Sequence, residues 1–211
     1  MTTLGTMKAE MASILKRGDL STEIGEVIAH SIAELQDERL WFRETKTATI
    51  TCVVGQVYYA AADDADIPLM SNFDDLQIRI SNNDYSLRRI RDIGEFETLN
   101  DGNVSNGQPY AFIYYAQSIG LYPPPDSAYV VTMLGGYDTA APATDGEADN
   151  VWMTKAYRLV MYRALAWLNR VRIRNFDLAN QFEGQAAREL DRLYTRTSRL
   201  KSNNRLIPTC W

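Results

Sequence analysis

The stretch that decides the fold is GQPYAFIYYAQSIGLYPPPDSAYVVTMLGGY, which covers residues 107–137. Its aromatic and β-branched runs predict three short strands at Tyr110–Tyr115, Gln117–Tyr122 and Ala128–Leu134. Proline cannot donate to a β-ladder and glycine interrupts one, so the prolines at 123–125 separate the last two strands and Gly135–Gly136 closes the third. Because helical sequence lies on both sides, we expect a β-module inserted between helices from the two ends of the chain.

Two helices are predicted before this β-module. Apolar residues at three- and four-residue spacing indicate a first helix over Met7–Arg17, which Gly18 ends. Ser21 is a suitable N-cap for a second helix, which we expect to reach Phe42. His30, the only histidine, lies off the apolar stripe of this helix, with no cysteine or carboxylate at ligand spacing. A structural role is therefore favoured for it over a metal site.

Further strands are expected between the second helix and the central stretch. Thr45–Val54 alternates and is followed by a turn and by Val57–Tyr59, which predicts a hairpin with Cys52 as an inert thiol on its buried face. Leu76–Ile80 and Ser86–Ile90 predict a second hairpin. Its outward cations form the one basic patch of an acidic half: Arg79, Arg88, Arg89 and Arg91. This patch fits an acidic neighbouring subunit at least as well as phosphate, because no aromatic series for base stacking accompanies it.

Two long helices are predicted after the β-module. Asp149 is a candidate N-cap for a helix to about Arg174, which is apolar over more than half its circumference and so belongs at the centre of a bundle. A fourth helix follows over Leu178–Leu200. Its other faces carry a series of arginines, with these members: Arg188, Arg192, Arg196 and Arg199. Such a face is either solvated or directed at an acidic partner or phosphate.

The chain ends in a tail that has no core of its own. Its residues are Asn203, Asn204, Arg205, Leu206, Ile207, Pro208, Thr209, Cys210 and Trp211. Because the tail carries three large apolar side chains, we expect another chain to hold it. Burying those side chains contributes roughly 5–8 kcal/mol, whereas ordering the backbone costs on the order of 10 kcal/mol. A single tail would therefore bind weakly, and a ring of tails would bind strongly through effective concentration.

The composition allows one large domain or two small ones, with 211 residues of which 45% are hydrophobic. Charge is divided unevenly along the chain. Residues 155–211 carry 12 Lys/Arg against 4 Asp/Glu, or +8, and residues 1–154 carry 10 against 23, or −13. This division favours head-to-tail contact between copies or a basic end that faces an acidic partner, and a solvated basic helix is the alternative. We expect no membrane span and no signal peptide.

No catalytic or metal-binding motif stands out. The sequence has no phosphate-binding Gly-Lys-Ser/Thr loop, no G-x-S-x-G elbow and no H-E-x-x-H. The acids Asp63, Asp64 and Asp66 lack the glycine and closing glutamate of a calcium loop, so an acidic turn is favoured there. Two cysteines are too few for a disulfide framework. We therefore predict no catalytic residue, no cofactor and no metal, and an enzyme is the less favoured class.

Several segments together resemble the head-to-tail adaptor (connector) proteins of tailed phages. They are GQPY at 107–110, IGLYP at 119–123, YVV at 129–131, VGQVY at 54–58 and LWF at 40–42. The tubular tail protein A family of short-tailed phages is the nearest in pattern. Two parts depart from it: Ala60–Asp63 replaces a Leu-Pro-Asp type of sequence, and the basic fourth helix with its Trp-ended tail is less familiar.

The resemblance implies an α+β fold. A helical bundle domain would comprise residues 1–44 and 148–202, an inserted antiparallel β-rich domain residues 45–147, and an extended C-terminal tail residues 203–211. It also implies a structural virion protein, made in the host cytoplasm and located at the head–tail junction. Such a protein forms a ring, commonly of twelve copies, between the portal and the tail nozzle, and double-stranded DNA passes through the ring without specific binding.

The resemblance also assigns roles to the singled-out residues. The tail, Asn203–Trp211, would dock on the portal. The arginines of the fourth helix would contact a subunit or the portal, since a channel for sliding DNA should not hold phosphates. The four arginines of the second hairpin would contact a neighbour or the nozzle. Two alternatives stay open, a tail-associated peptidoglycan-degrading enzyme and a DNA-binding protein that uses the hairpin arginines.

Overall fold

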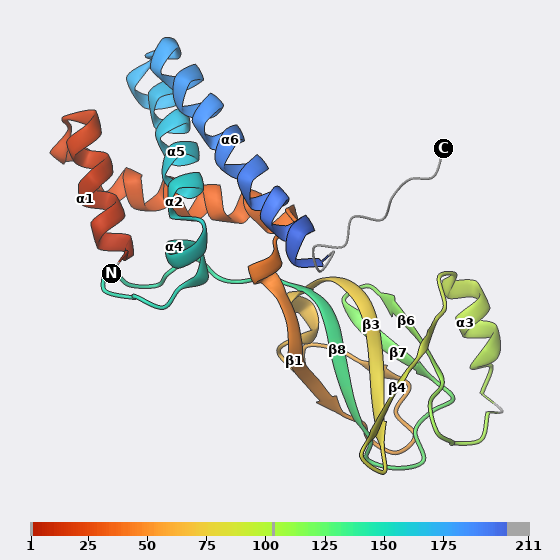
Figure 1. The fold of residues 1–211 in the computed structure, drawn as a ribbon. Coiled ribbons are helices and arrows are strands. Elements are labelled where there is room, and N and C mark those ends of the chain that lie inside the picture. The colour runs from red at the N-terminus through yellow and green to blue at the C-terminus, as the bar shows by residue number, and fades with distance from the viewer. Residues whose placement is uncertain (1, 103, 202–211) are drawn as a thin grey trace, which may run out of the picture. The chain divides into compact units, whose positions relative to one another are not determined.

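A computed structural model describes residues 2–102 and 104–201, which form a mixed α+β fold with six α-helices and two four-stranded sheets (Figure 1). The chain divides into two compact units. The helical unit is built from residues up to Phe42 and from Thr139 onward, and the β-unit is Arg43–Asp138. Each unit has a hydrophobic core of its own residues.

The helical unit has five α-helices within the described residues. They are α1 (Leu4–Leu15), α2 (Ser21–Glu34), α4 (Val151–Lys155), α5 (Tyr157–Leu168) and α6 (Phe176–Lys201). Short 3-10 turns lie at Gly18–Leu20, Leu35–Asp37 and Trp41–Arg43, and a π-helical turn lies at Asn169–Ile173. Helix α5 packs against α1, α2 and α6, and most of its apolar side chains are buried. The predicted central position of this apolar helix is confirmed.

The helix boundaries differ from the prediction in two places. Helix α2 ends at Glu34 and not at Phe42, because the chain turns there and buries Leu40 completely. The helix predicted to run unbroken from Asp149 is capped one residue later, by Asn150, whose side chain accepts from the backbone N–H of Trp152 at 3.1 Å. It is also interrupted at Ala156, whose φ of −127° and ψ of 19° are not helical.

The β-unit contains two sheets and one short helix. The first sheet has the order β1 (Glu44–Thr51), β8 (Val130–Tyr137), β3 (Met70–Ile80) and β4 (Asn83–Ser86), all antiparallel. The second has the order β2 (Tyr58–Tyr59), β7 (Ser118–Tyr122), β6 (Ala111–Tyr115) and β5 (Arg88–Arg89). Its pairs are antiparallel except β5–β6, which is parallel and departs from the predicted antiparallel domain. Helix α3 (Ile93–Leu99) begins after Asp92, whose side chain accepts from the backbone N–H of Gly94.

The three strands predicted from the central stretch are confirmed, but they belong to two sheets. Strands β6 and β7 pair with each other, whereas β8 lies between β1 and β3. Gly135–Gly136 does not close the third strand, because β8 continues to Tyr137. A Cβ on Gly135 would lie 2.0 Å from the carbonyl oxygen of Asn72, so glycine is needed where β3 approaches and the ladder changes register.

The two predicted hairpins have different outcomes. The first is wrong, because β1 pairs with β8 and β2 pairs with β7 in the other sheet. The second is confirmed only for its first strand. Strand β3 does form a hairpin, joined by Ser81 and Asn82 in left-handed conformation with φ of 49° and 67°, but its partner is β4 (Asn83–Ser86) and not the predicted Ser86–Ile90. Its second strand ends at Ser86, so Arg88 and Arg89 leave it and pair in the other sheet.

Candidate protein-docking groove

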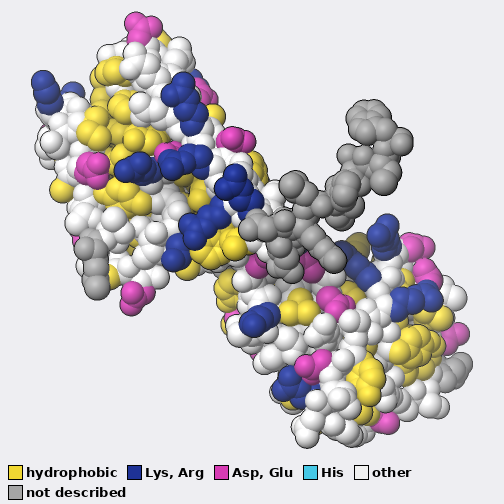
Figure 2. Space-filling view, viewed as in Figure 1, with side chains coloured by type: hydrophobic (Ala, Val, Ile, Leu, Met, Phe, Trp, Pro, Cys, Tyr) yellow, Lys and Arg dark blue, Asp and Glu magenta, His cyan; other side chains and the backbone are white. Residues whose placement is uncertain are grey.

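The arginines predicted to form a basic face lie on the C-terminal half of α6. Arg188, Arg192 and Arg196 follow at four-residue spacing, which places them on one side of the helix. Arg199 follows three residues later. Figure 2 shows Lys and Arg side chains gathered over this half of α6. The predicted cationic face therefore exists.

Two adjoining hollows accompany this face. The larger, of about 540 Å³, is lined by Glu189, Arg192, Leu193, Thr195, Arg196 and Arg199. The smaller, of about 150 Å³, is lined by Thr154, Lys155, Ala156, Tyr157, Arg158, Leu159, Glu189 and Leu193. Because they share Glu189 and Leu193, we treat them as one surface and call it the cationic groove. Its charged lining consists of five cations and one acid, Glu189.

The interruption between α4 and α5 explains the smaller hollow. Lys155 ends α4, Tyr157 begins α5, and Ala156 between them is buried with non-helical backbone angles. Lys155 and Arg158 on either side of the interruption both line the hollow beside α6. Ala156 also lines it, and its small methyl side chain leaves the hollow open. The groove thus depends on a local backbone change in an otherwise helical segment.

An aromatic ring lies beneath the cations of both hollows. The Nζ of Lys155 lies 5.8 Å and the Cζ of Arg196 lies 4.7 Å from the ring centroid of Trp41, which are cation–π distances. The backbone N–H of Trp41 donates to the hydroxyl of Thr197 at 3.2 Å. Residues 35–42 are therefore held against the end of α6, and they supply an aromatic surface for its arginines.

A second contact fixes the same segment. The hydroxyl of Tyr194 on α6 donates a hydrogen bond to the carboxylate of Glu38. This bond, and then burial, raise the pKa of Tyr194 to about 12, because both oppose a second negative charge beside Glu38. Tyr194 is consequently protonated, and remains a donor, over the whole neutral range.

Several groove cations have no internal counter-charge. Among the residues that the structure describes, Lys155, Arg158 and Arg196 have no carboxylate within ion-pair distance. Arg192 shares Glu189 at 2.8 Å. The indole N–H of Trp41 is buried and finds no acceptor in the described part of the chain. The groove is therefore cationic, which suits an anionic partner.

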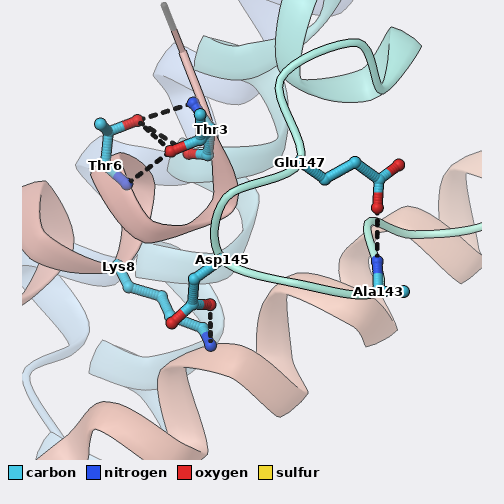
Figure 3. Close-up of polar contacts among 6 residues, drawn as sticks. All are labelled: Thr3, Thr6, Lys8, Ala143, Asp145 and Glu147. Atoms are coloured by element: carbon cyan, nitrogen blue, oxygen red, sulfur yellow. Dashed lines mark hydrogen bonds and ion pairs between the residues drawn. The ribbon is translucent and has the colours of Figure 1, made fainter.

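The acidic loop before α4 is used within the helical unit (Figure 3). The carboxylate of Asp145 binds the Nζ of Lys8 at 2.6 Å, and its carbonyl accepts from the backbone N–H of Gly5 at 3.0 Å. The Glu147 carboxylate accepts from the backbone N–H of Ala143 at 2.8 Å. Asp145 thus fixes the loop to the start of α1 and Glu147 braces the loop itself, so both carboxylates are already engaged inside the molecule.

The four arginines predicted as a hairpin patch do not lie on one hairpin. Arg79 on β3 is paired with Asp84 at 2.8 Å, and Arg88 on β5 of the other sheet is paired with Glu95 at 3.1 Å. Arg89 donates to a backbone carbonyl at 3.4 Å. Since Arg88 and Arg89 are consecutive in a strand, they point to opposite faces. Arg91 follows β5 and is exposed.

Other predicted sites have simpler outcomes. The tail residues, Asn203–Trp211, lie outside the described residues. His30 lies 3.3 Å from Glu34, four residues on along α2, so the expected lack of a carboxylate at ligand spacing is wrong; its ring is edge-on to Trp167. Within residues 2–102 and 104–201, no cluster of three or more His, Cys, Asp or Glu could hold a metal ion. No helix of the same residues is long and apolar enough to cross a membrane. Cys52 is buried as predicted, and burial raises the pKa of its thiol to about 11.

The described residues thus combine a helical unit that carries the cationic groove with a β-unit built on two sheets. A family model described as SU10 adaptor protein matches residues 2–208. The chain therefore belongs to the SU10 adaptor protein family. A search of curated proteins finds no match.

Family membership confirms the predicted class at a coarse level. The protein is a structural adaptor of a bacteriophage virion, in a family that is not one of enzymes, and it associates with other phage head and tail proteins. The finer resemblance to the tubular tail protein A family stays a prediction.

Sequence reasoning missed part of the groove. Trp41 falls in the predicted second helix, and Lys155 and Arg158 fall in the helix predicted to run unbroken from Asp149. Their proximity to α6 depends on the turn after Glu34 and on the interruption at Ala156. Neither feature leaves a local signal, so only the four-residue spacing of the α6 arginines could point to this surface.

Proposed function

We propose that the protein is a head-to-tail adaptor. Several copies, by resemblance twelve, form a ring between the portal and the tail nozzle, and the genome passes through its channel. The match to the adaptor family over residues 2–208 is the observation that carries this proposal. The arrangement with a bundle domain (1–44 and 148–202), an inserted β-domain (45–147) and a terminal tail belongs to the same proposal.

We assign a partner to each of three candidate docking surfaces. The tail, Asn203–Trp211, binds the portal, and the arginines of α6 contact a subunit or the portal. The β-unit arginines contact a neighbour or the nozzle. The unpaired cations of the groove support the second assignment, because a charge left without a counter-ion gains most from a partner. The net charge of −5 supports a channel that does not hold DNA.

The mass of the purified chain, alone and mixed with portal rings, tests the function. Full-length protein is compared with a version that ends at Ser202. We expect a monomer alone, a ring of copies with the portal, and loss of that ring on truncation. A monomer that is indifferent to the portal would remove the adaptor function, and a zymogram on peptidoglycan would then test the enzyme alternative.

Charge reversal tests the role of the α6 arginines. Arg192→Glu with Arg196→Glu should block assembly with the portal or between copies. The control is Arg172→Glu with Arg174→Glu, which makes the same change of charge at two exposed positions before α6. If the groove variant assembles normally and only retains DNA differently, these arginines face the channel and the assignment is wrong.

A further inference from the structure

We propose that the cationic groove binds an extended acidic segment of a different protein, whose carboxylates contact Lys155, Arg192 and Arg196. The inference deepens the proposed function and rests on it for one point, that the partner is a head or tail protein. It adds the chemistry by which the groove recognises that partner. Arginine forks suit carboxylates because they donate two parallel hydrogen bonds.

Carboxylates fit the groove better than the phosphates of DNA do. The larger hollow has a volume of about 540 Å³, a size that holds a few side chains. The apolar Leu193 lies in both hollows, and the Arg192 guanidinium lies 2.8 Å from the Glu189 carboxylate. A phosphate would meet the negative charge of Glu189 and the apolar surface of Leu193. A peptide offers apolar atoms for Leu193, and its carboxylate can replace that of Glu189 on Arg192.

The β-unit of a second copy is a less suitable partner. The β-unit, residues 43–138, is the acidic part of the chain, yet most of its carboxylates already accept hydrogen bonds or ion pairs inside the unit. Asp84 binds Arg79 and Glu95 binds Arg88, for example. These acids would have to leave one arginine to reach another. A segment with unpaired carboxylates binds without that exchange.

Trp41 gives the groove a further contact. Its ring supports Arg196 at 4.7 Å and Lys155 at 5.8 Å, so both cations are placed without being neutralised. Its buried N–H has no acceptor in the described chain, which is an uncommon state for a buried donor. Trp41→Phe tests the ring contact, because phenylalanine keeps an aromatic face but is a weaker cation–π partner than tryptophan.

The test uses the full chain and a fluorescent peptide in which glutamate alternates with glycine, with a glutamine–glycine peptide as its control. Fluorescence anisotropy should show binding of the glutamate peptide only. Arg192→Gln and Arg196→Gln should each weaken binding about tenfold, the value of one hydrogen bond to a charged group. Glu189→Gln should strengthen binding, because it removes the internal competitor for Arg192. Arg172→Gln, outside the groove, should change nothing.

Trp41→Phe should weaken binding of the glutamate peptide by about threefold, since the smaller ring holds Lys155 and Arg196 less firmly. Unchanged fluorescence of the other tryptophans shows that the variants are folded. In wild-type protein labelled with ¹⁵N, the indole N–H resonance of Trp41 should shift when the peptide binds and should not shift with the glutamine peptide.

Three results would overturn the proposal. In the first, the groove substitutions leave binding of the glutamate peptide unchanged. In the second, a labelled DNA duplex binds more tightly than the peptide and depends on the same arginines. In the third, the protein does not bind the peptide, and Arg196→Gln abolishes its self-association. The last result would give the groove to a second copy. If the peptide does not bind but the protein assembles normally on portal rings, only the proposal for the groove is rejected. If the peptide binds but the protein does not assemble with the portal, only the proposed adaptor function is rejected.

Discussion

Replacing Gly135 with alanine tests how closely β3 and β8 approach in the first sheet. An added Cβ would lie 2.0 Å from the carbonyl oxygen of Asn72, 3.0 Å from its carbonyl carbon and 3.1 Å from the Cα of Phe73. All three atoms belong to backbone, so no side-chain rotation relieves the clash. Gly135 is also paired with Thr45 of β1, which prevents β8 from moving freely to the other side.

The cost can be worked from this geometry. A carbon–oxygen contact is comfortable at about 3.3 Å, so β3 and β8 must separate locally by roughly 1.3 Å. That displacement breaks about two hydrogen bonds of the β3–β8 ladder, and each loss costs roughly 1 kcal/mol of stability. Overpacking adds about 1–3 kcal/mol. We therefore expect Gly135→Ala to destabilise the β-unit by about 3–5 kcal/mol.

The two units can be followed separately in the assay. All four tryptophans lie outside residues 43–138, so their fluorescence during urea unfolding reports the helical unit. Amide hydrogen exchange of Val130–Tyr137 reports the β-unit. Gly135→Ala should lower the protection of β8. Gly184→Ala in α6, where no atom lies within 4 Å of the added Cβ, should instead stabilise the helical unit by about 0.5–1 kcal/mol. Unchanged protection of β8 in Gly135→Ala would refute the close approach.

Two further predictions concern ionisable groups. The pKa of Tyr194 is raised above its ordinary value, so its bond to Glu38 stabilises the fold fully below about pH 10 and is lost as pH rises toward 12. The difference in urea midpoint between wild type and Tyr194→Phe should therefore shrink over that interval, and a constant difference would contradict it. Burial raises the pKa of Cys52 to about 11, so in a Cys210→Ser background iodoacetamide should label it only after unfolding. Labelling of folded protein would show that the thiol is accessible.

The strands of the central stretch were predictable because their signals are local. Aromatic and β-branched runs between prolines and glycines place β6, β7 and β8 to within a few residues. Their distribution over two sheets was not predictable, since strand partners are set by tertiary packing. The Gly135–Gly136 pair shows the limit most clearly. The sequence alone cannot tell a glycine that ends a strand from one that allows a neighbouring backbone to approach. Only the position of Asn72 in the structure shows that Gly135 has the second role.

The helices show the same division between local and tertiary causes. Regular apolar spacing predicted α1 and α6, and the cap at Asn150 was missed by one residue. The interruption at Ala156 was missed because alanine has the highest helix propensity, so only packing against other elements can break a helix there. The cationic face of α6 followed from spacing, whereas its position over Trp41 required the turn after Glu34.

Net charge gives the wrong impression of what this chain can bind. The β-unit carries 6 Lys/Arg and 13 Asp/Glu, and the rest of the chain carries 16 and 14, so the surplus is acidic. Yet most acids of the β-unit have partners inside it, while Lys155, Arg158 and Arg196 have no carboxylate in the described chain. The cations of the groove are therefore among the charges that still gain from a partner. The chain as a whole repels an acidic partner, whereas the groove attracts one. Added salt screens both the repulsion and the attraction. The affinity is therefore decided by the local geometry of the groove.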